Sequence, residues 1–113
     1  MTPIPDVIKQ RFLKDPPPAR LGSIAADLAR LSGLAEAEGS VKTPVFWGIL
    51  NEVKFFTEWT AAELNFEQQE CILGLQRTIA QWREDRIANL KTADLSYQAK
   101  IWSENLLSAS GLL

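Results

Sequence analysis

Thr43 to Thr60, TPVFWGILNEVKFFTEWT, is the stretch that decides the fold we predict for this chain. Thr43 offers a hydroxyl that can cap a helix, and Pro44 suits the first helical position, where no amide donor is needed. Apolar residues then recur at steps of three and four. The segment therefore predicts an α-helix from Thr43 to about Thr60.

This helix is predicted to be apolar on two sides. With about 100° of rotation per residue, one face carries Val45, Ile49, Val53 and Phe56, flanked by Phe46 and Leu50. Trp47 and Phe55 project from roughly the opposite side, and Trp59 lies on a flank. A surface helix needs a single apolar stripe, so a second one requires a second partner. That partner is either the rest of this protein, around a central helix, or another molecule, and the pattern leaves both interpretations open.

The remaining sequence also has helical apolar spacing, without the sustained alternation that is typical of strands. Further helices are expected up to about Lys14, from Leu21 to Gly33 or Gly39, from Asn65 to about Lys91, and from Asp94 onward. Residues 15–19 are predicted to form a rigid proline-rich connector, because prolines lack an amide donor and favour extended geometry before them. We therefore predict an all-α single domain over residues 1–113, an antiparallel four-helix bundle with an additional short N-terminal helix.

Composition excludes several classes of function. The 113 residues carry a formal net charge of −2, and the four basic residues between Lys9 and Arg20 are too dispersed to make a nucleic-acid surface. No apolar run is long enough to span a bilayer, and the N-terminus lacks the pattern of a secretory signal. A lone cysteine, Cys71, cannot form an internal disulfide. These features predict a cytoplasmic protein that binds neither nucleic acid nor membrane.

Residues that carry catalytic chemistry are scarce. The sequence has no histidine, which removes the usual general base and its nucleophile pairs. Cys71 alone gives too few soft ligands for zinc, and no glycine-rich phosphate loop is present. Neighbouring carboxylates such as Glu67 and Glu70 fall in the first turns of a helix, where they compensate its dipole. We therefore predict no enzymatic activity, no cofactor and no metal site.

The surplus aromatic residues indicate the function instead. In the last helix, Tyr97 and Ile101 lie one turn apart, opposite the main apolar stripe. Because aromatic side chains anchor protein interfaces, we predict a non-enzymatic protein-interaction module, either a homodimer or an adaptor in a larger complex. The predicted interface residues are Trp47, Phe55, Trp59, Tyr97 and Ile101. The alternative is a helical bundle that binds an apolar small molecule or cofactor among its tryptophans.

Arg86 is the second unusual feature, because it falls near the middle of the apolar stripe of its helix. Either the core ends there and the guanidinium reaches solvent, which we favour, or the side chain is buried and must be paired. A buried Arg86 would contact an anion or a carboxylate. The candidate carboxylates are Glu52, Glu58 and Glu104.

Several short stretches resemble a small, uncharacterised group of all-helical cyanobacterial proteins. They are RFL at 11–13, PPPARLG at 16–22, LAR at 28–30, KFFTEWTAAEL at 54–64 and SGLL at 110–113. The resemblance implies a cytoplasmic helical protein without an assigned activity. It implies no role for any residue.

Overall fold

The structure, a computed structural model, describes residues 4–37, 43–82 and 92–111. Every regular element in these ranges is helical, and the helices pack around a shared hydrophobic core, so the predicted all-α class is confirmed. The elements are α1 (Asp6–Leu13), α2 (Pro17–Glu36), α3 (Pro44–Thr60), the 3-10 turn η2 (Ala61–Glu63), α4 (Phe66–Ala80) and α6 (Thr92–Ser110).

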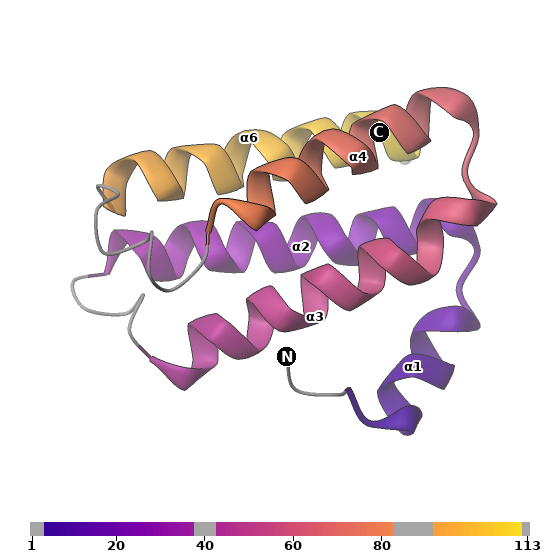
Figure 1. The fold of residues 1–113 in the computed structure, drawn as a ribbon, viewed down its shortest axis with the longest axis horizontal. Coiled ribbons are helices and arrows are strands. Elements are labelled where there is room, and N and C mark those ends of the chain that lie inside the picture. The colour runs from indigo at the N-terminus through magenta and orange to yellow at the C-terminus, as the bar shows by residue number, and fades with distance from the viewer. Residues whose placement is uncertain (1–3, 38–42, 83–91, 112–113) are drawn as a thin grey trace.

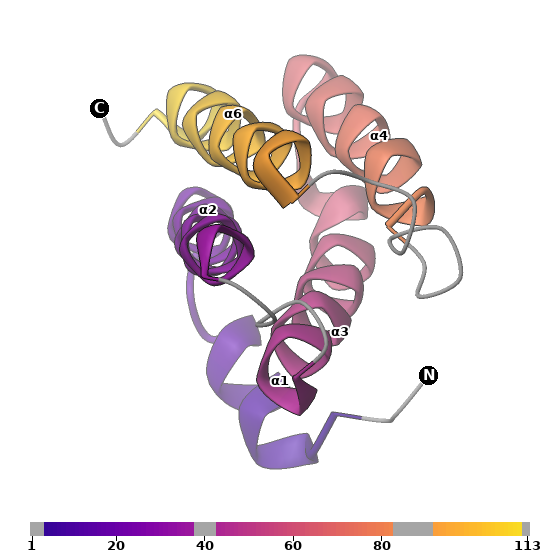
Figure 2. The same ribbon diagram turned by 90° about the vertical axis from the view of Figure 1, so that its left-hand side faces the viewer.

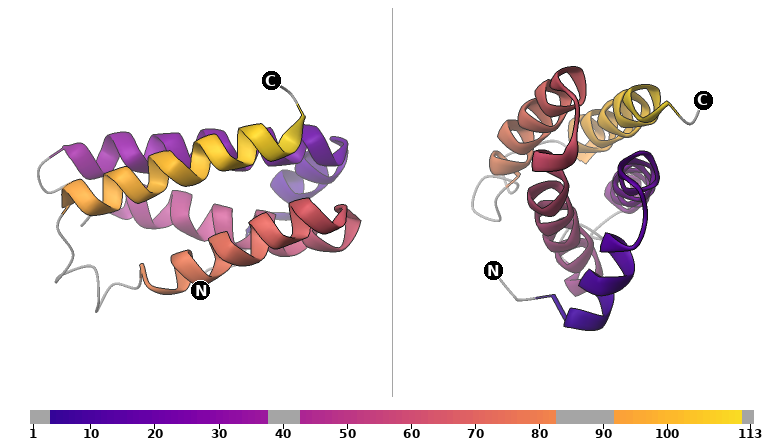
Figure 3. Two further views of the ribbon diagram at one scale, coloured as in Figure 1. Left: turned by 90° about the horizontal axis from the view of Figure 1, so that it is seen from above. Right: turned by 90° about the vertical axis from the view of Figure 1, so that its right-hand side faces the viewer.

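The four longer helices run back and forth across the molecule. Figure 1 shows α2, α3, α4 and α6 each reversing the direction of the helix before it, with α1 set apart at one end. Viewed end-on, α6 and α4 lie on one side of the molecule and α1 on the other, with α2 and α3 between them (Figure 2). The most extensive packing joins α2 to α6, which run alongside each other in Figure 3.

Two predicted helix starts are confirmed. The Oγ1 atom of Thr43 accepts the amide of Phe46 at 3.4 Å, and α3 begins at Pro44. At the start of α4, Asn65 and Gln68 form a capping box in which each side chain accepts the other residue's amide, at 2.9 and 3.2 Å. These caps are local, so a few adjacent residues are enough to predict them.

The proline-rich connector is shorter than predicted. Helix α2 begins at Pro17, so the predicted connector over residues 15–19 is wrong for residues 17–19. Pro16 remains extended, with ψ at 159°, and serves as the N-cap. The first turn of a helix has no intrahelical acceptor for its amides, so prolines at its start sacrifice no hydrogen bond.

Helix α4 also ends earlier than predicted, at Ala80 instead of about Lys91. The amides of Gln81 and Trp82 donate to carbonyls three residues earlier, at 3.0 and 2.9 Å, which tightens the last turn. The Trp82 side chain is fully buried, and its Nε1 donates to Gln98 of α6 at 3.0 Å. Docking of this indole onto α6 accompanies the end of the helix.

The core face of α3 differs from the predicted face at one residue. Val45 is 58% exposed, whereas Phe46, which we expected at the flank, is fully buried. The buried residues centre near Val53, and Val45 lies about 80° away from it around the helix. The expected grouping of Val45 with the core is therefore wrong.

Small residues bring α2 and α6 close together. The hydroxyls of Ser32 and Ser96 each donate to the other residue's backbone carbonyl, at 2.9 and 3.0 Å. Further along, the Ser103 hydroxyl donates to the carbonyl of Ala25 at 2.7 Å. Buried hydroxyls that find backbone partners allow close helix packing without unsatisfied polar groups.

Candidate functional site

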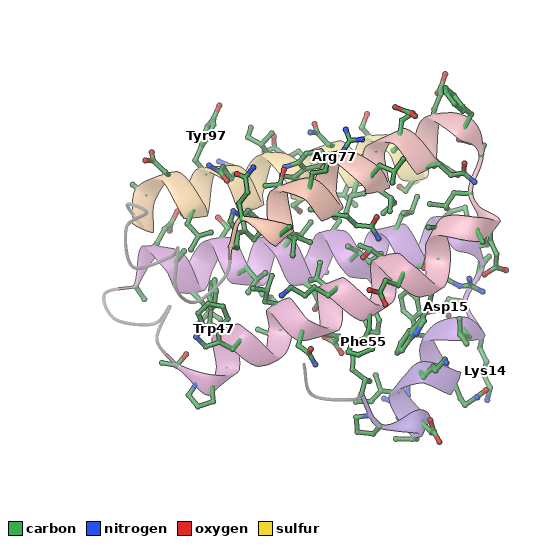
Figure 4. All side chains as sticks on the ribbon, in the orientation of Figure 1. Lys14, Asp15, Trp47, Phe55, Arg77 and Tyr97 are labelled. Carbon is green, nitrogen blue, oxygen red and sulfur yellow. The ribbon has the colours of Figure 1, made fainter. Side chains whose placement is uncertain are left out.

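The predicted interface residues do not lie on a single surface. Tyr97 is 66% exposed, while Trp47, Phe55, Trp59 and Ile101 are half-buried. In Figure 4, Tyr97 points outward from α6, whereas Phe55 lies on the opposite side of the molecule, toward α1. Helix α3 is therefore neither enclosed on all sides nor exposed along a whole second face.

Helix α1 packs against Phe56 on the core face of α3 and against Trp59 on its flank. The ring of Phe12 stacks on Phe56, with centroids 3.9 Å apart and planes 9° apart. Trp59 lies beside both rings, with centroids 6.1 Å from Phe12 and 5.8 Å from Phe56, and Phe55 lies 5.5 Å from Trp59. Lys9 of α1 places its Nζ 5.1 Å from the Trp59 ring centroid. These contacts give Trp59 a partner on α1, whereas the ring contact of Phe55 is with Trp59 of its own helix.

Arg20 has a structural role that sequence reasoning missed. Its side chain is buried, and its guanidinium donates to the backbone carbonyls of Asp15 at 2.8 Å and Leu13 at 3.0 Å. It also forms an ion pair with Glu63 in η2. The guanidinium thus connects the end of α1 to the turn between α3 and α4, which satisfies a buried charge.

The lone cysteine, Cys71, is half-buried, and this burial raises the pKa of its thiol. A raised pKa lowers the thiolate fraction at neutral pH and makes the cysteine less reactive. No group of three or more potential metal ligands gathers within the described ranges. Arg86 lies outside the described residues, so its anion contact stays a prediction.

Two carboxyl groups, Asp27 of α2 and Glu52 of α3, interact with each other. The sequence analysis named Glu52 only as a candidate partner of Arg86, and it did not name Asp27. Asp27 is only 6% exposed, and its Oδ1 accepts from Arg30 Nη1 at 3.4 Å. The pKa of Asp27 is raised from 3.8 to about 7. Burial of the carboxyl is the largest cause, followed by its interaction with the nearby Glu52 carboxyl. With its pKa raised to about 7, the Asp27 carboxyl is partly protonated near neutral pH.

The second oxygen of Asp27 supports this protonation. Oδ2 is buried and has no hydrogen-bond partner among the other donor groups of the described chain. A buried carboxylate oxygen without a donor is costly, and protonation of Asp27 lowers that cost because it removes the charge. The burial of Asp27 could have been predicted from the sequence, because Asp27 lies on the apolar stripe of α2, between Ile24 and Leu31.

A pocket of 430 Å³ is lined in part by Glu52 and Arg30, whereas Asp27 does not line it. One wall is apolar and comes from Ile4, Pro5 and Ile8 around the start of α1. The other lining residues come from the first half of α3 and from Arg30 of α2, and the polar ones are Arg30, Asn51 and Glu52. None of the described tryptophans lines this pocket, so it differs from the tryptophan-lined site of our alternative prediction.

Comparisons with known proteins add no functional information. Searches with the chain find no matching family model, no matching curated protein and no matching solved structure. The resemblance to a cyanobacterial group therefore stays a prediction. No helix within the described ranges has both the length and the apolar run that a membrane span requires.

Proposed function

We propose that this protein is a non-enzymatic interaction module that self-associates through the outer face of α4. The supporting observation is a row of side chains that face away from the core. Phe66 is 75% exposed and Leu73 is 45% exposed, two turns apart on one face of the helix. Exposed large apolar side chains aligned on a helix are typical of interaction surfaces.

The charges within this row favour a second copy of the chain as the partner. Glu70 and Arg77 lie on the same exposed face, one on each side of Leu73, and neither forms an ion pair within the described chain. Consider two α4 helices packed antiparallel, with the two-fold axis near Leu73. Glu70 of each copy then faces Arg77 of the other. The face is therefore complementary to itself, as a two-fold interface requires.

The neighbouring helix supplies two of the residues predicted from the sequence. Tyr97 and Ile101 lie on α6, which packs against α4 where Trp102 contacts Gly74. One helix face alone is small compared with the roughly 800 Å² per partner of a stable dimer. We therefore propose a weak dimer, in which Tyr97 and Ile101 extend the surface made by α4.

Charge reversal tests this proposal. The variants E70R and R77E each place like charges opposite each other twice in a symmetric dimer, and each should weaken dimerisation by about tenfold. The double variant E70R/R77E restores both pairs with exchanged signs and should restore dimerisation. Sedimentation equilibrium over a range of protein concentrations measures all three dissociation constants.

Hydrophobic variants supply the matched control. Leu73→Glu should abolish dimerisation, whereas Val7→Glu, at a residue 65% exposed on α1, should leave it unchanged. A wild-type chain that stays monomeric at every concentration would contradict self-association. A dimer that tolerates Leu73→Glu would contradict the α4 face.

We also propose a more detailed architecture and a cellular location for this protein. The alternating directions of α2, α3, α4 and α6 and their shared core support an antiparallel four-helix bundle with α1 as the additional helix. The lone cysteine supports a reducing compartment, for which we propose the cytoplasm.

A further inference from the structure

Helix α1 is attached to the rest of the molecule by few side chains. Phe12 is its only buried residue, and the Phe12 ring stacks on Phe56 and lies 5.9 Å from the guanidinium carbon of Arg20. Lys9 adds a cation–π contact with the Trp59 ring at 5.1 Å. Figure 1 shows α1 apart from the other helices, at one end of the molecule. A single buried ring is a small attachment for a helix.

The helix and the bundle differ in how much they depend on this contact. An isolated helix of 8 residues is marginal in water, so α1 stays helical because α3 holds it. Within the described chain, every other buried member of the hydrophobic core comes from Leu21 onward. Burial of one phenylalanine favours docking by a factor of about 10–100, whereas the folding of a whole domain is favoured by about 10³–10⁸. Undocking of α1 therefore requires far less free energy than unfolding of the bundle.

The connector between α1 and α2 has the properties of a hinge. The two helices are separated by residues 14–16, which are all exposed. The prolines at 16–18 prevent the helices from fusing into one, because they lack amide donors. Arg20 holds the hinge through the carbonyls of Leu13 and Asp15, at 3.0 and 2.8 Å. Because these hydrogen bonds reach the backbone at the hinge, they do not depend on the contact of Phe12 with α3.

We propose that α1 is a detachable arm, which leaves α3 while the other helices stay folded, and that α1 of a second copy of the chain takes its place. The vacated face of α3 presents Phe56 and Trp59, so its occupant must supply an aromatic ring and a cation on one side of a helix. Phe12 and Lys9 are three residues apart on α1 and meet this requirement. Every copy carries the same arm, so exchange keeps these contacts.

Undocking of the arm also changes the surface beside it. Ile4, Pro5 and Ile8 line the 430 Å³ pocket together with α3, so one wall of this pocket leaves with α1. A short tether holds the arm at an effective concentration of about 1 mM. At low protein concentration each copy therefore keeps its own arm. Exchange between copies requires protein near this concentration or a weakened contact at Phe12.

Hydrogen exchange of the wild-type chain tests whether the arm detaches. The amides of α1 should exchange only about 10–100-fold more slowly than those of an unstructured peptide. Low urea should leave their rates almost unchanged, because local opening exposes little surface. The amides of α2 and α6 should be protected by at least about 10³ and should respond to urea. Equal protection and equal urea dependence in α1 and α2 would overturn the proposal.

A labelled peptide of residues 4–16, IPDVIKQRFLKDP, tests the occupant. It should bind the full-length Phe12→Ala variant, whose own arm cannot stack on Phe56, about 10–100-fold more tightly than the wild type, whose arm competes. Two matched control peptides carry one substitution each. Phe12→Ala in the peptide should abolish binding, whereas Val7→Ala, at a residue 65% exposed, should leave it unchanged.

Circular dichroism checks that the Phe12→Ala protein is folded. If it is not, Lys9→Glu, which replaces the cation at Trp59, serves as the weakened arm. A folded variant that does not bind the peptide, or equal binding of the two control peptides, would overturn the exchange. The α4 face takes no part in either experiment, so charge reversal at Glu70 or Arg77 should leave both results unchanged.

Discussion

The two sides of the helix assembly are packed in different ways. On the α6 side, small residues allow close approach: Ser32 and Ser96 exchange hydrogen bonds, and the indole of Trp102 lies directly on Gly74. On the α1 side, the contact is made by large rings such as Phe12 and Phe56, beside a pocket of 430 Å³. Close packing leaves little room for a ligand, whereas a short helix docked through large rings leaves more room. The interior of the α6 side is therefore the more closely packed of the two.

The largest test of this difference compares two tryptophans. Trp82→Ala, on the α6 side, removes a fully buried indole and its hydrogen bond to Gln98, and should lower the free energy of unfolding by about 3–5 kcal/mol. Trp59→Ala, on the α1 side, removes a half-buried indole and should cost about half as much. Urea denaturation of both variants measures the difference. Equal losses would contradict the division into two sides.

A second test uses pH, because Asp27 of α2 is a buried ionisable group. The pKa of Asp27 is raised from 3.8 to about 7, so the folded state binds this proton more tightly than the unfolded state. Stability should then be highest at the acidic end and should fall by about 2–4 kcal/mol as pH rises from about 4 to about 7. Urea titrations at several pH values measure this slope.

The isosteric variant Asp27→Asn isolates that effect. Its side chain cannot ionise, so the slope assigned to Asp27 should disappear, and the variant should be more stable than the wild type at about pH 8. Glu58→Gln, at an exposed carboxylate on α3, should keep the wild-type slope. A slope that persists in the Asp27→Asn variant would assign the pH dependence to other groups.

Sequence alone predicted the elements that depend on neighbouring residues. The caps at Thr43 and Asn65 are examples, since each needs a side chain and an amide three residues away. The start of α2 was misplaced because a run of prolines permits both an extended connector and a helix start. Propensity alone does not choose between these two structures.

The candidate site was less predictable, because it is formed by tertiary contacts. Asp27 and Glu52 are on different helices, and their proximity depends on how α2 packs on α3. An acidic residue within an apolar stripe was visible in the sequence at Asp27, but its partner was not. The aromatic surplus of α3 was visible too, yet the docking of α1 on Trp59 was needed to assign part of it to the core.

The smallest test adds one methyl group to each side. Gly48 lies on α3 at the pocket, and a Cβ there meets no atom within 4 Å, so Gly48→Ala should stabilise the protein by about 0.5–1 kcal/mol through helix propensity. Gly74 lies under Trp102, where a Cβ would be 2.7 Å from Cη2 of the indole. Because that rigid ring must shift, Gly74→Ala should destabilise the protein despite the same gain in propensity. Thermal denaturation should show Tm changes of opposite sign, and a rise in both would mean that the α6 side is not closely packed.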